Sequence, residues 1–255
     1  MSLRAPARQE PDFGKLNKWR CKWGKDGSHV YVLDGFSGTC TSACLHALKT
    51  IRNVRVVCID KDHSLDYVRS FIPSNLKYWD KVLYIQDDIR QLDKRKLLSK
   101  IQAVWPKAEY CHFIHLHLSP SCRTYSRADR GISRHRNRDG TPLTVRAKDD
   151  DSALRHAVRL VLEIHKCCPT ACITIENPVS WTFGLVPCIA KLRRSPGWAW
   201  LTCSYCKCAD PRFDSGQMWP RKDTNFLVFG LPHRFKLPMC NLNCEYLVHH
   251  SGEWP

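Results

Sequence analysis

Residues 118–126 read LSPSCRTYS and follow an apolar run, 111–118, that is typical of a buried strand. Pro120 has no backbone donor, so it should end the strand and leave Cys122 on the loop beyond it. In α/β proteins, reactive groups sit where strands end. Arg123 places positive charge beside the sulfur, which favours the nucleophilic thiolate. The stretch predicts an α/β fold with Cys122 as nucleophile; a buried, structural cysteine is the alternative.

Composition sets the broad class. The chain has 255 residues, enough for one α/β domain with a small appendage, and 40 Lys and Arg against 24 Asp and Glu give a formal charge of +16. This charge indicates a polyanionic partner, most simply nucleic acid, although a merely basic soluble protein has the same composition. Fifteen cysteines, an odd number scattered through the expected strands, favour reduced thiols over disulfides.

The sequence gives no sign of a membrane segment. No apolar run is long enough to cross a bilayer, and residues 1–10 lack the apolar core of a signal peptide. We therefore expect an intracellular, soluble monomer, located in the nucleus if the source is eukaryotic.

A glycine-bearing loop follows the first expected strand. Residues 29–33 predict a short buried strand, the segment 34–39 reads DGFSGT, and a helical stretch covers about 42–49. A strand, a tight turn and a helix N-terminus bring backbone N–H groups close to a ligand's phosphate or carboxylate. Because ordinary tight turns use the same residues, the loop alone is a weak signal.

Acidic residues end the next two expected strands. The strand 54–59 ends at Asp60, at the interval where nucleotide-binding α/β folds place an acid for ribose hydroxyls. The strand 82–85 is followed by Asp87 and Asp88, either of which could accept from an adenine amino group. For each acid, a cap on the following helix is an equally good interpretation.

An arginine-rich segment follows the nucleophile. Residues 123–148 show no hydrophobic period but contain seven arginines, including Arg127 and Arg136, together with turn residues. The segment predicts a mobile loop that clamps phosphates around a target base, with a disordered insertion as the alternative. Residues 149–152, DDDS, should then cap a helix.

A second polar group ends the fifth expected strand, 171–175, which is followed by Glu176-Asn177-Pro178. If this strand is the parallel neighbour of the strand before Cys122, the carboxyl and the thiol emerge at the same edge of the sheet. Such a pair makes a nucleophile and a proton handler. On its own, the tripeptide is also an ordinary turn.

The last third is rich in cysteine. Paired cysteines about thirty residues apart, with a histidine close behind, predict a structural zinc site; free cysteines on short strands are the alternative. The expected ligands are Cys206, Cys240, Cys244 and His249. We therefore expect a basic, aromatic arm over 1–28, an α/β domain over 29–200 and a Cys-rich module over 201–255.

Three motifs, taken in order, resemble those of C5-cytosine methyltransferases. DGFSGT at 34–39 resembles the S-adenosylmethionine loop of that family, SPSC at 119–122 its Pro-Cys nucleophile motif, and ENP at 176–178 its Glu-Asn-Val motif. The resemblance extends over about residues 29–250 and is closest to the compact enzymes of phages, mobile elements and protists. Ser121 and Cys40 depart from the usual proline and glycine.

The resemblance implies a class I methyltransferase, Rossmann-like: a mixed sheet with helices on both faces, which binds S-adenosylmethionine and methylates C5 of a cytosine flipped out of double-stranded DNA. It implies the catalytic residues Cys122, Glu176 and Arg123. It implies cofactor contacts from Asp34, Phe36, Ser37, Gly38, Thr39, Asp60, Asp87, Asp88 and Pro120. It implies nucleic-acid contacts from Ser126, Arg127, Arg130, Arg134 and Asn177.

Three alternatives remain at this point. An RNA cytosine could be the substrate, since charge and base flipping do not separate DNA from RNA. An amino-group methyltransferase (N4 or N6) would place a Ser-Pro-x-aromatic motif at the same strand end. A catalytically impaired methyltransferase-like protein would bind nucleic acid without turnover.

Overall fold

The computed structural model describes residues 29–38, 53–62, 64, 66–67, 79–125, 135–180, 182–204, 219–220, 223–230 and 247–248. The expected arm over 1–28, the helix at 42–49 and all four expected zinc ligands lie outside the described residues.

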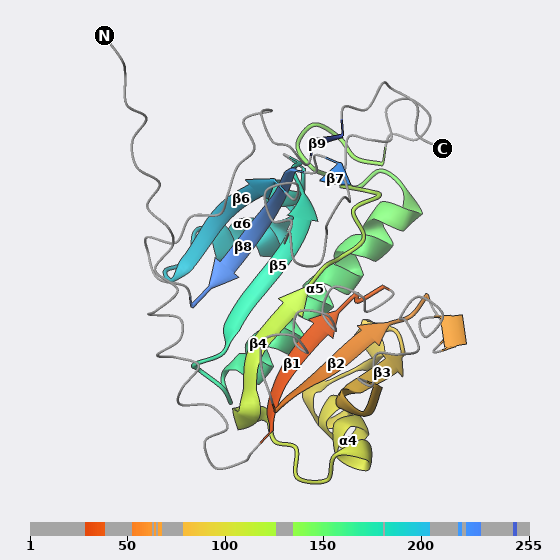
Figure 1. The fold of residues 1–255 in the computed structure, drawn as a ribbon. Helices are drawn as coiled ribbons and strands as arrows, with labels where there is room; N and C mark the ends of the chain where they lie inside the picture. The colour runs from red at the N-terminus through yellow and green to blue at the C-terminus, as the bar shows by residue number, and fades with distance from the viewer. Residues whose placement is uncertain are drawn as a thin grey trace.

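A seven-stranded mixed sheet forms the centre of the molecule, in the order β3-β2-β1-β4-β5-β8-β6 (Figure 1). Strands β1 to β5 are parallel to their neighbours, whereas β8 is antiparallel to both β5 and β6. This confirms the expected Rossmann-like mixed sheet. The strands are β1 (Val30–Gly35), β2 (Val54–Asp60), β3 (Val82–Gln86), β4 (Phe113–Leu118), β5 (Cys172–Pro178), β6 (Trp198–Ser204) and β8 (Asp223–Phe229).

The central strands are apolar because both faces of the sheet are covered there. Every residue of β1 is buried, and five of the seven residues of β2 are buried. Parallel strands buried on both faces read as continuous apolar runs, and VRVVCID in β2 follows that rule apart from Arg55. The Arg55 guanidinium lies 4.9 Å from the ring centroid of Trp105, so its stem packs while its charge faces an aromatic surface.

Three helices follow the strands: α4 (Lys94–Val104), α5 (Val145–His165) and α6 (Pro187–Arg193). In Figure 1, α5 and α6 lie behind the sheet, and α4 contacts α5. Single turns of 3-10 helix cover Trp79–Lys81, Ile89–Gln91, Tyr110–His112 and Phe183–Leu185.

Helix α5 begins earlier than the sequence suggested. Its N-cap is Thr144, whose hydroxyl accepts from the Ala147 N–H, so the expected cap at 149–152 is wrong. The acidic residues lie inside the helix because one of them, Asp151, binds a buried arginine there.

The end of one strand and the extent of the sheet also differ from expectation. Strand β5 continues through Glu176 and Asn177 to Pro178, because these residues pair with β8. Strand β8 lies between β5 and β6, so the sheet of the α/β domain extends beyond the expected boundary at residue 200. A separate pair, β7 (Trp219–Pro220) and β9 (Leu247–Val248), is parallel. Among the described residues, no helix combines the length and apolarity that a membrane span requires.

Candidate active site

The loop after β1 has a backbone that most residues avoid. Phe36 has φ 60° and Gly38 has φ 55°, both left-handed, and a bulky residue in that region is uncommon. The loop is held against β2: the Ser37 N–H donates to the Ile59 carbonyl at 3.1 Å, and the Gly38 N–H donates to Asp60 Oδ2 at 2.8 Å. Among the described residues, no atom lies within 4 Å of a Cβ added to Gly38.

Asp60 lies where the sequence predicted it, at the end of β2. Its second oxygen, Oδ1, accepts from the Asp62 N–H at 2.8 Å, so the carboxylate orders its own loop as well as Gly38. Each carboxylate oxygen has a further lone pair that can accept a hydroxyl. Asp34, also an expected cofactor residue, is buried within β1, in register with Cys58 and His117.

The two acids after β3 differ. Asp88 is an N-cap: it accepts from the Arg90 backbone and pairs with the Arg90 side chain. The hydrogen bonds from Arg90 lower the pKa of Asp88, with burial opposing them. The alternative of a cap therefore describes Asp88, whereas Asp87 lies 3.4 Å from the Lys100 ammonium.

Two hydrogen bonds join the ends of β4 and β5. The Ser119 hydroxyl donates to Glu176 Oε2 at 2.6 Å, and the Asn177 amide donates to the Pro120 carbonyl at 3.1 Å. The Ser119 N–H also donates to the Gly35 carbonyl at 3.0 Å, which ties the same loop to β1. The prediction that Glu176 and the nucleophile loop emerge at one edge of neighbouring parallel strands is confirmed.

Cys122 lies half-buried in a turn closed by the Tyr125 N–H, which donates to the Cys122 carbonyl at 3.0 Å. Ser121 and Arg123 are exposed, so the turn presents both neighbours of the cysteine to solvent. Catalytic roles for Cys122, Glu176 and Arg123 stay predictions.

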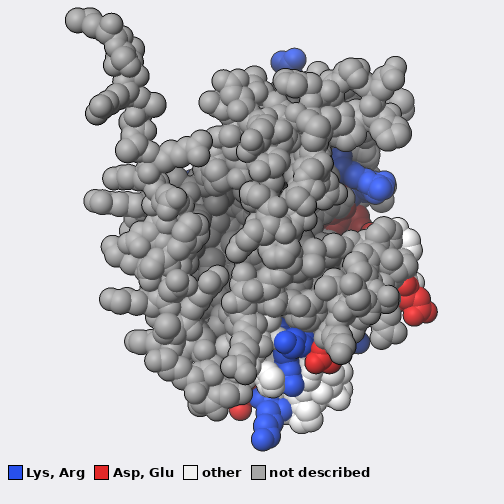
Figure 2. All heavy atoms as spheres, viewed as in Figure 1, with Lys and Arg blue, Asp and Glu red and all other residues white. Residues whose placement is uncertain are grey.

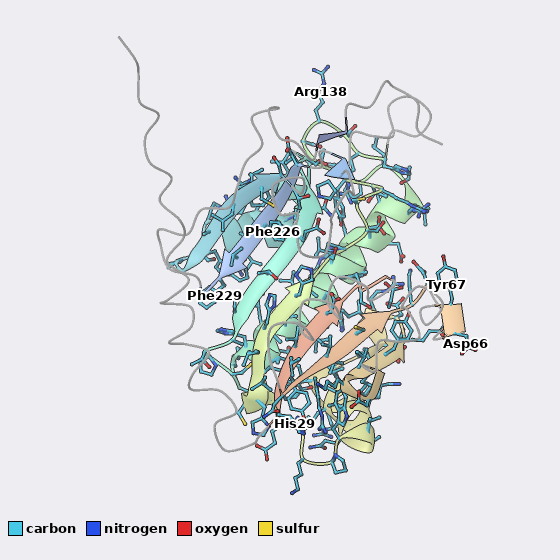
Figure 3. All side chains as sticks on the ribbon, viewed as in Figure 1. His29, Asp66, Tyr67, Arg138, Phe226 and Phe229 are labelled. Atoms are coloured by element: carbon cyan, nitrogen blue, oxygen red, sulfur yellow. The ribbon has the colours of Figure 1, made fainter. Side chains whose placement is uncertain are left out.

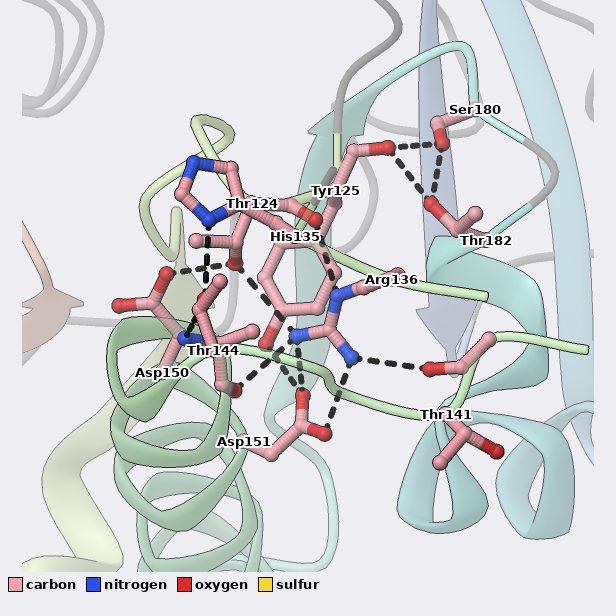
Figure 4. Close-up of polar contacts among 12 residues, drawn as sticks. Thr124, Tyr125, His135, Arg136, Thr141, Thr144, Asp150, Asp151, Ser180 and Thr182 are labelled. Carbon is pink, nitrogen blue, oxygen red and sulfur yellow. Dashed lines mark hydrogen bonds and ion pairs between the residues drawn. The ribbon is translucent and has the colours of Figure 1, made fainter. Parts of the chain in front are cut away.

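A buried ion pair anchors this turn to α5. The Arg136 guanidinium contacts both oxygens of Asp151, at 2.6 and 3.0 Å, and donates to the Thr124 carbonyl at 2.9 Å (Figure 4). It also lies 4.3 Å from the ring centroid of Tyr125, whose hydroxyl donates to Asp151 at 3.0 Å. We call these four residues, Thr124, Tyr125, Arg136 and Asp151, the Arg136 clamp.

Further hydrogen bonds close the clamp on both sides. The Thr124 hydroxyl donates to Asp150 Oδ2 at 2.6 Å, and the hydroxyls of Ser180 and Thr182 donate to the Tyr125 carbonyl. Burial, followed by the negative charge of Asp151, raises the pKa of Tyr125 far above its usual range, so the phenol keeps its proton and stays a donor. The loop after β4 is therefore fixed from α5 and from the segment after β5.

The arginine segment is less uniform than the sequence suggested. Arg136 is 7% exposed and is held within the protein, because Asp151 and three backbone carbonyls surround it, so it has no free donors for phosphates. Arg138, in contrast, is exposed and projects away from the molecule (Figure 3). The predicted contacts from Ser126, Arg127, Arg130 and Arg134 lie outside the described residues, as does Thr39.

Asn177 and Pro120, two further residues expected at the site, are both buried. Asn177 has no exposed surface, and its amide donates to the Pro120 carbonyl; its contact with nucleic acid stays a prediction. Pro120 is itself buried. Figure 2 shows basic and acidic side chains near one another at the lower end of the face in view. The described part of that face therefore carries mixed charge.

Sequence reasoning missed Ser119, Tyr125, Asp151 and the buried role of Arg136. Ser119 could have been found, since it directly precedes the proline that ends β4. The clamp could not, because nothing in the local pattern marks which of seven arginines pairs with which of three adjacent aspartates.

Comparisons with known proteins give distant likenesses only. No family model matches the chain, and no curated protein matches it. Similar solved structures include a human methyltransferase 10 domain containing protein, with TM-score 0.46 and 9% identity, covering 89% of this chain and 88% of that one. A putative rRNA-methylase from Clostridium thermocellum has TM-score 0.42 and 13% identity, over 88% of this chain and 99% of that one. A predicted O-methyltransferase from Agrobacterium tumefaciens has TM-score 0.44 and 9% identity, covering 92% of this chain and 88% of that one.

TM-scores below 0.5 at these identities assign no family, so function has to follow from the sheet and its residues. The strand order, with one antiparallel strand between β5 and β6, is that of the class I methyltransferase fold.

Proposed function

We propose that this chain is an S-adenosylmethionine-dependent methyltransferase that acts on C5 of a cytosine flipped out of double-stranded DNA. The observation that carries the proposal is the junction at the strand ends. The Ser119 hydroxyl donates to Glu176 at 2.6 Å, the Asn177 amide donates to the Pro120 carbonyl, and the Ser119 N–H donates to the Gly35 carbonyl at the end of β1. A thiol loop, a buried carboxyl and a candidate cofactor loop therefore share one edge of the sheet.

The residues at the β1 and β2 ends fit the cofactor. The Phe36 to Gly38 turn has two left-handed residues and is tied to β2 through Asp60, which has acceptor capacity for ribose hydroxyls at the end of that strand. Asp87, beyond β3, is the acid we assign to the adenine amino group, since Arg90 donates to both oxygens of Asp88, whereas the Lys100 ammonium lies near one oxygen of Asp87. S-adenosylmethionine supplies an electrophilic methyl group when bound.

The chain's own residues then carry the base chemistry. Cys122, as thiolate, adds to C6 of the flipped cytosine, and Glu176 contacts N3 and stabilises the charge that accumulates on the ring. C5 would accept the methyl group that S-adenosylmethionine supplies when bound, and the cofactor would be released as a neutral thioether. A base removes the C5 proton, the bond from C6 to sulfur breaks, and the thiolate is regenerated. Ser119 holds the Glu176 carboxyl, and the Arg136 clamp fixes the turn that carries Cys122.

Several other thiols are unsuited to the nucleophile's role. Burial raises the pKa of Cys172 to about 12, and burial also raises the pKa of Cys188. Both remain protonated at neutral pH. Cys122 differs in lying on the loop after β4, at the edge of the sheet that also carries Glu176.

Trapping on a 5-fluorocytosine duplex tests the proposal, since only a cysteine that adds to C6 becomes covalently attached. We expect a denaturant-resistant adduct that depends on S-adenosylmethionine, maps to Cys122 and disappears in Cys122→Ala. Cys188→Ala, a change of the same kind at another half-buried thiol, should trap normally. Cofactor binding should survive Cys122→Ala.

Three outcomes contradict the proposal. Methylation of an amino group without an adduct indicates the amino-group class. Methyl transfer to a matched RNA but not to DNA indicates an RNA substrate. Salt-sensitive DNA binding with no transfer to either indicates a protein that only binds.

A further inference from the structure

A cluster of mixed metal-ligand side chains lies at the opposite end of β4 from Cys122. Glu109, Cys111 and His112 immediately precede the strand, whereas Cys122 follows it. One ligand atom from each, a carboxylate oxygen, a thiol sulfur and an imidazole nitrogen, lies within 4.8 Å of the other two. The mechanism above uses none of these residues.

The local fold points these three side chains outward together. The segment forms a 3-10 turn, Tyr110–His112, in which the His112 N–H donates to the Glu109 carbonyl at 3.2 Å. Tyr110 and Phe113 are buried, which leaves Glu109 and Cys111 exposed and His112 half-exposed. The turn thus separates its apolar anchors from its polar residues.

The anchors make the turn rigid. The Tyr110 hydroxyl donates to the Lys94 carbonyl at the start of α4, and the Phe113 ring packs against Tyr31 with centroids 5.5 Å apart. The His112 ring is itself stacked on Tyr31, with an interplanar angle of 20°.

The distances suit a small tetrahedral ion. Zinc bonds of about 2.0 Å to oxygen and nitrogen and about 2.3 Å to sulfur separate tetrahedral ligand atoms by about 3.3–3.6 Å. Cys111 Sγ already lies 3.3 Å from Glu109 Oε2, so only the imidazole has to approach by a side-chain rotation. One sulfur, one nitrogen and one oxygen form the borderline ligand set that favours zinc over magnesium or calcium.

We propose that Glu109, Cys111 and His112 form a binding site for a divalent ion of the zinc class, with water in the fourth position. The nearby exposed thiol of Cys167 is not a ligand, because it accepts a hydrogen bond from the Lys94 ammonium at 3.5 Å, and a cation beside it would repel a bound metal. This site is separate from the zinc site predicted for the C-terminal cysteines.

Residue-specific alkylation tests this site in the full chain, irrespective of other metal sites. The metal-stripped protein is treated with iodoacetamide with and without zinc, and modification of each cysteine is followed by mass spectrometry. We expect zinc to slow alkylation of Cys111 by about tenfold or more, because a metal-bound thiolate is a poor nucleophile. The protection should be lost in His112→Gln and in Glu109→Gln. Glu109 is exposed, so its variant folds even if His112→Gln does not.

Cys167→Ser provides the matched control, since it alters an exposed thiol in the same corner and should leave the protection of Cys111 unchanged. The proposal is overturned if zinc leaves the alkylation of Cys111 unaffected, if Glu109→Gln keeps full protection, or if Cys167→Ser abolishes it. None of these readouts involves methyl transfer, so the result is independent of the proposed function.

Discussion

The two halves of the candidate active site are held by different kinds of contact. At the ends of β1 to β3, carboxylates accept from backbone N–H groups: Asp60 binds Gly38, 22 residues away, and Asp62, two away. At the ends of β4 and β5, side chains join residues 57 positions apart, as in Ser119 with Glu176. The first half is held by hydrogen bonds that backbone N–H groups donate, and the second depends on side-chain contacts with α5 and β5.

The difference indicates where the site is most easily damaged. A loop held by hydrogen bonds from partly exposed backbone N–H groups loses little stability when one contact is removed, because those N–H groups can donate to water instead. The turn that carries Cys122 is anchored through a buried charge pair, where loss of one partner leaves the other without compensation.

The largest effect should come from breaking the Arg136 clamp. Asp151→Ala leaves the Arg136 guanidinium buried and unpaired, and we expect the free energy of unfolding to fall by about 3–5 kcal/mol. Denaturant titration of the variant measures the loss.

The neighbouring acid is the control. Burial, opposed by the hydrogen bond from Thr124, raises the pKa of Asp150, so its ionised form is disfavoured in the fold. Because its folded pKa lies above its unfolded pKa, the ionised carboxylate lowers stability as pH rises through that range. Asp150→Asn should therefore stay within about 0.5 kcal/mol of the unchanged protein at neutral pH, or exceed it. Equal losses in the two variants would contradict the assignment of the clamp.

The next effect concerns the contact between the two halves. A Cβ on Gly35 would lie 2.7 Å from Leu118 Cδ2 and 3.3 Å from Ile89 Cδ1. We expect Gly35→Ala to lower the free energy of unfolding by about 1–3 kcal/mol through overpacking.

A double-mutant cycle sharpens this expectation. Leu118→Val removes Cδ2, so Gly35→Ala should be less destabilising in that background, with a coupling of about 1 kcal/mol. An unchanged cost would show that the strain arises elsewhere.

A smaller change in stability but a clear change in activity is expected at Ser119. Ser119→Ala removes the hydrogen bond to Glu176 and should lower stability by about 1 kcal/mol. If the proposed function holds, turnover should fall about 10- to 100-fold, because the carboxyl is no longer held against the base. Ser119→Thr keeps the hydroxyl and should restore most of the turnover; if it is as inactive as Ser119→Ala, the hydroxyl has no positioning role.

The contrast between the halves also explains what the sequence could predict. Strand, turn and acid in the β1 to β3 half are read from local patterns, and Asp60 lies where expected. The emergence of Glu176 beside the nucleophile loop followed from one assumption, that β4 and β5 are parallel neighbours. The sequence predicts that Arg136 lies in a mobile phosphate-binding segment, because its burial depends on a partner 15 residues away that no periodicity identifies. The insertion of β8 between β5 and β6 is likewise a non-local pairing.

The smallest effect on stability should occur in the half of the site at the ends of β1 to β3, at Asp88. The hydrogen bond from the Arg90 side chain is the main cause of the lowered Asp88 pKa. The ionised carboxylate therefore stabilises the fold fully when the pH is above 3.8, the usual pKa of the group, and this stabilisation is lost as the pH falls through the lowered folded pKa. Asp88→Asn keeps a good N-cap while removing the charge, and should lower stability by about 0.5–1 kcal/mol at neutral pH. Thermal unfolding across a pH series measures the difference, which should shrink well below pH 3.8. A difference that is constant with pH would mean that the cap hydrogen bond, and not the ion pair with Arg90, provides the stabilisation. The half of the site at the ends of β1 to β3 would then depend on backbone contacts alone.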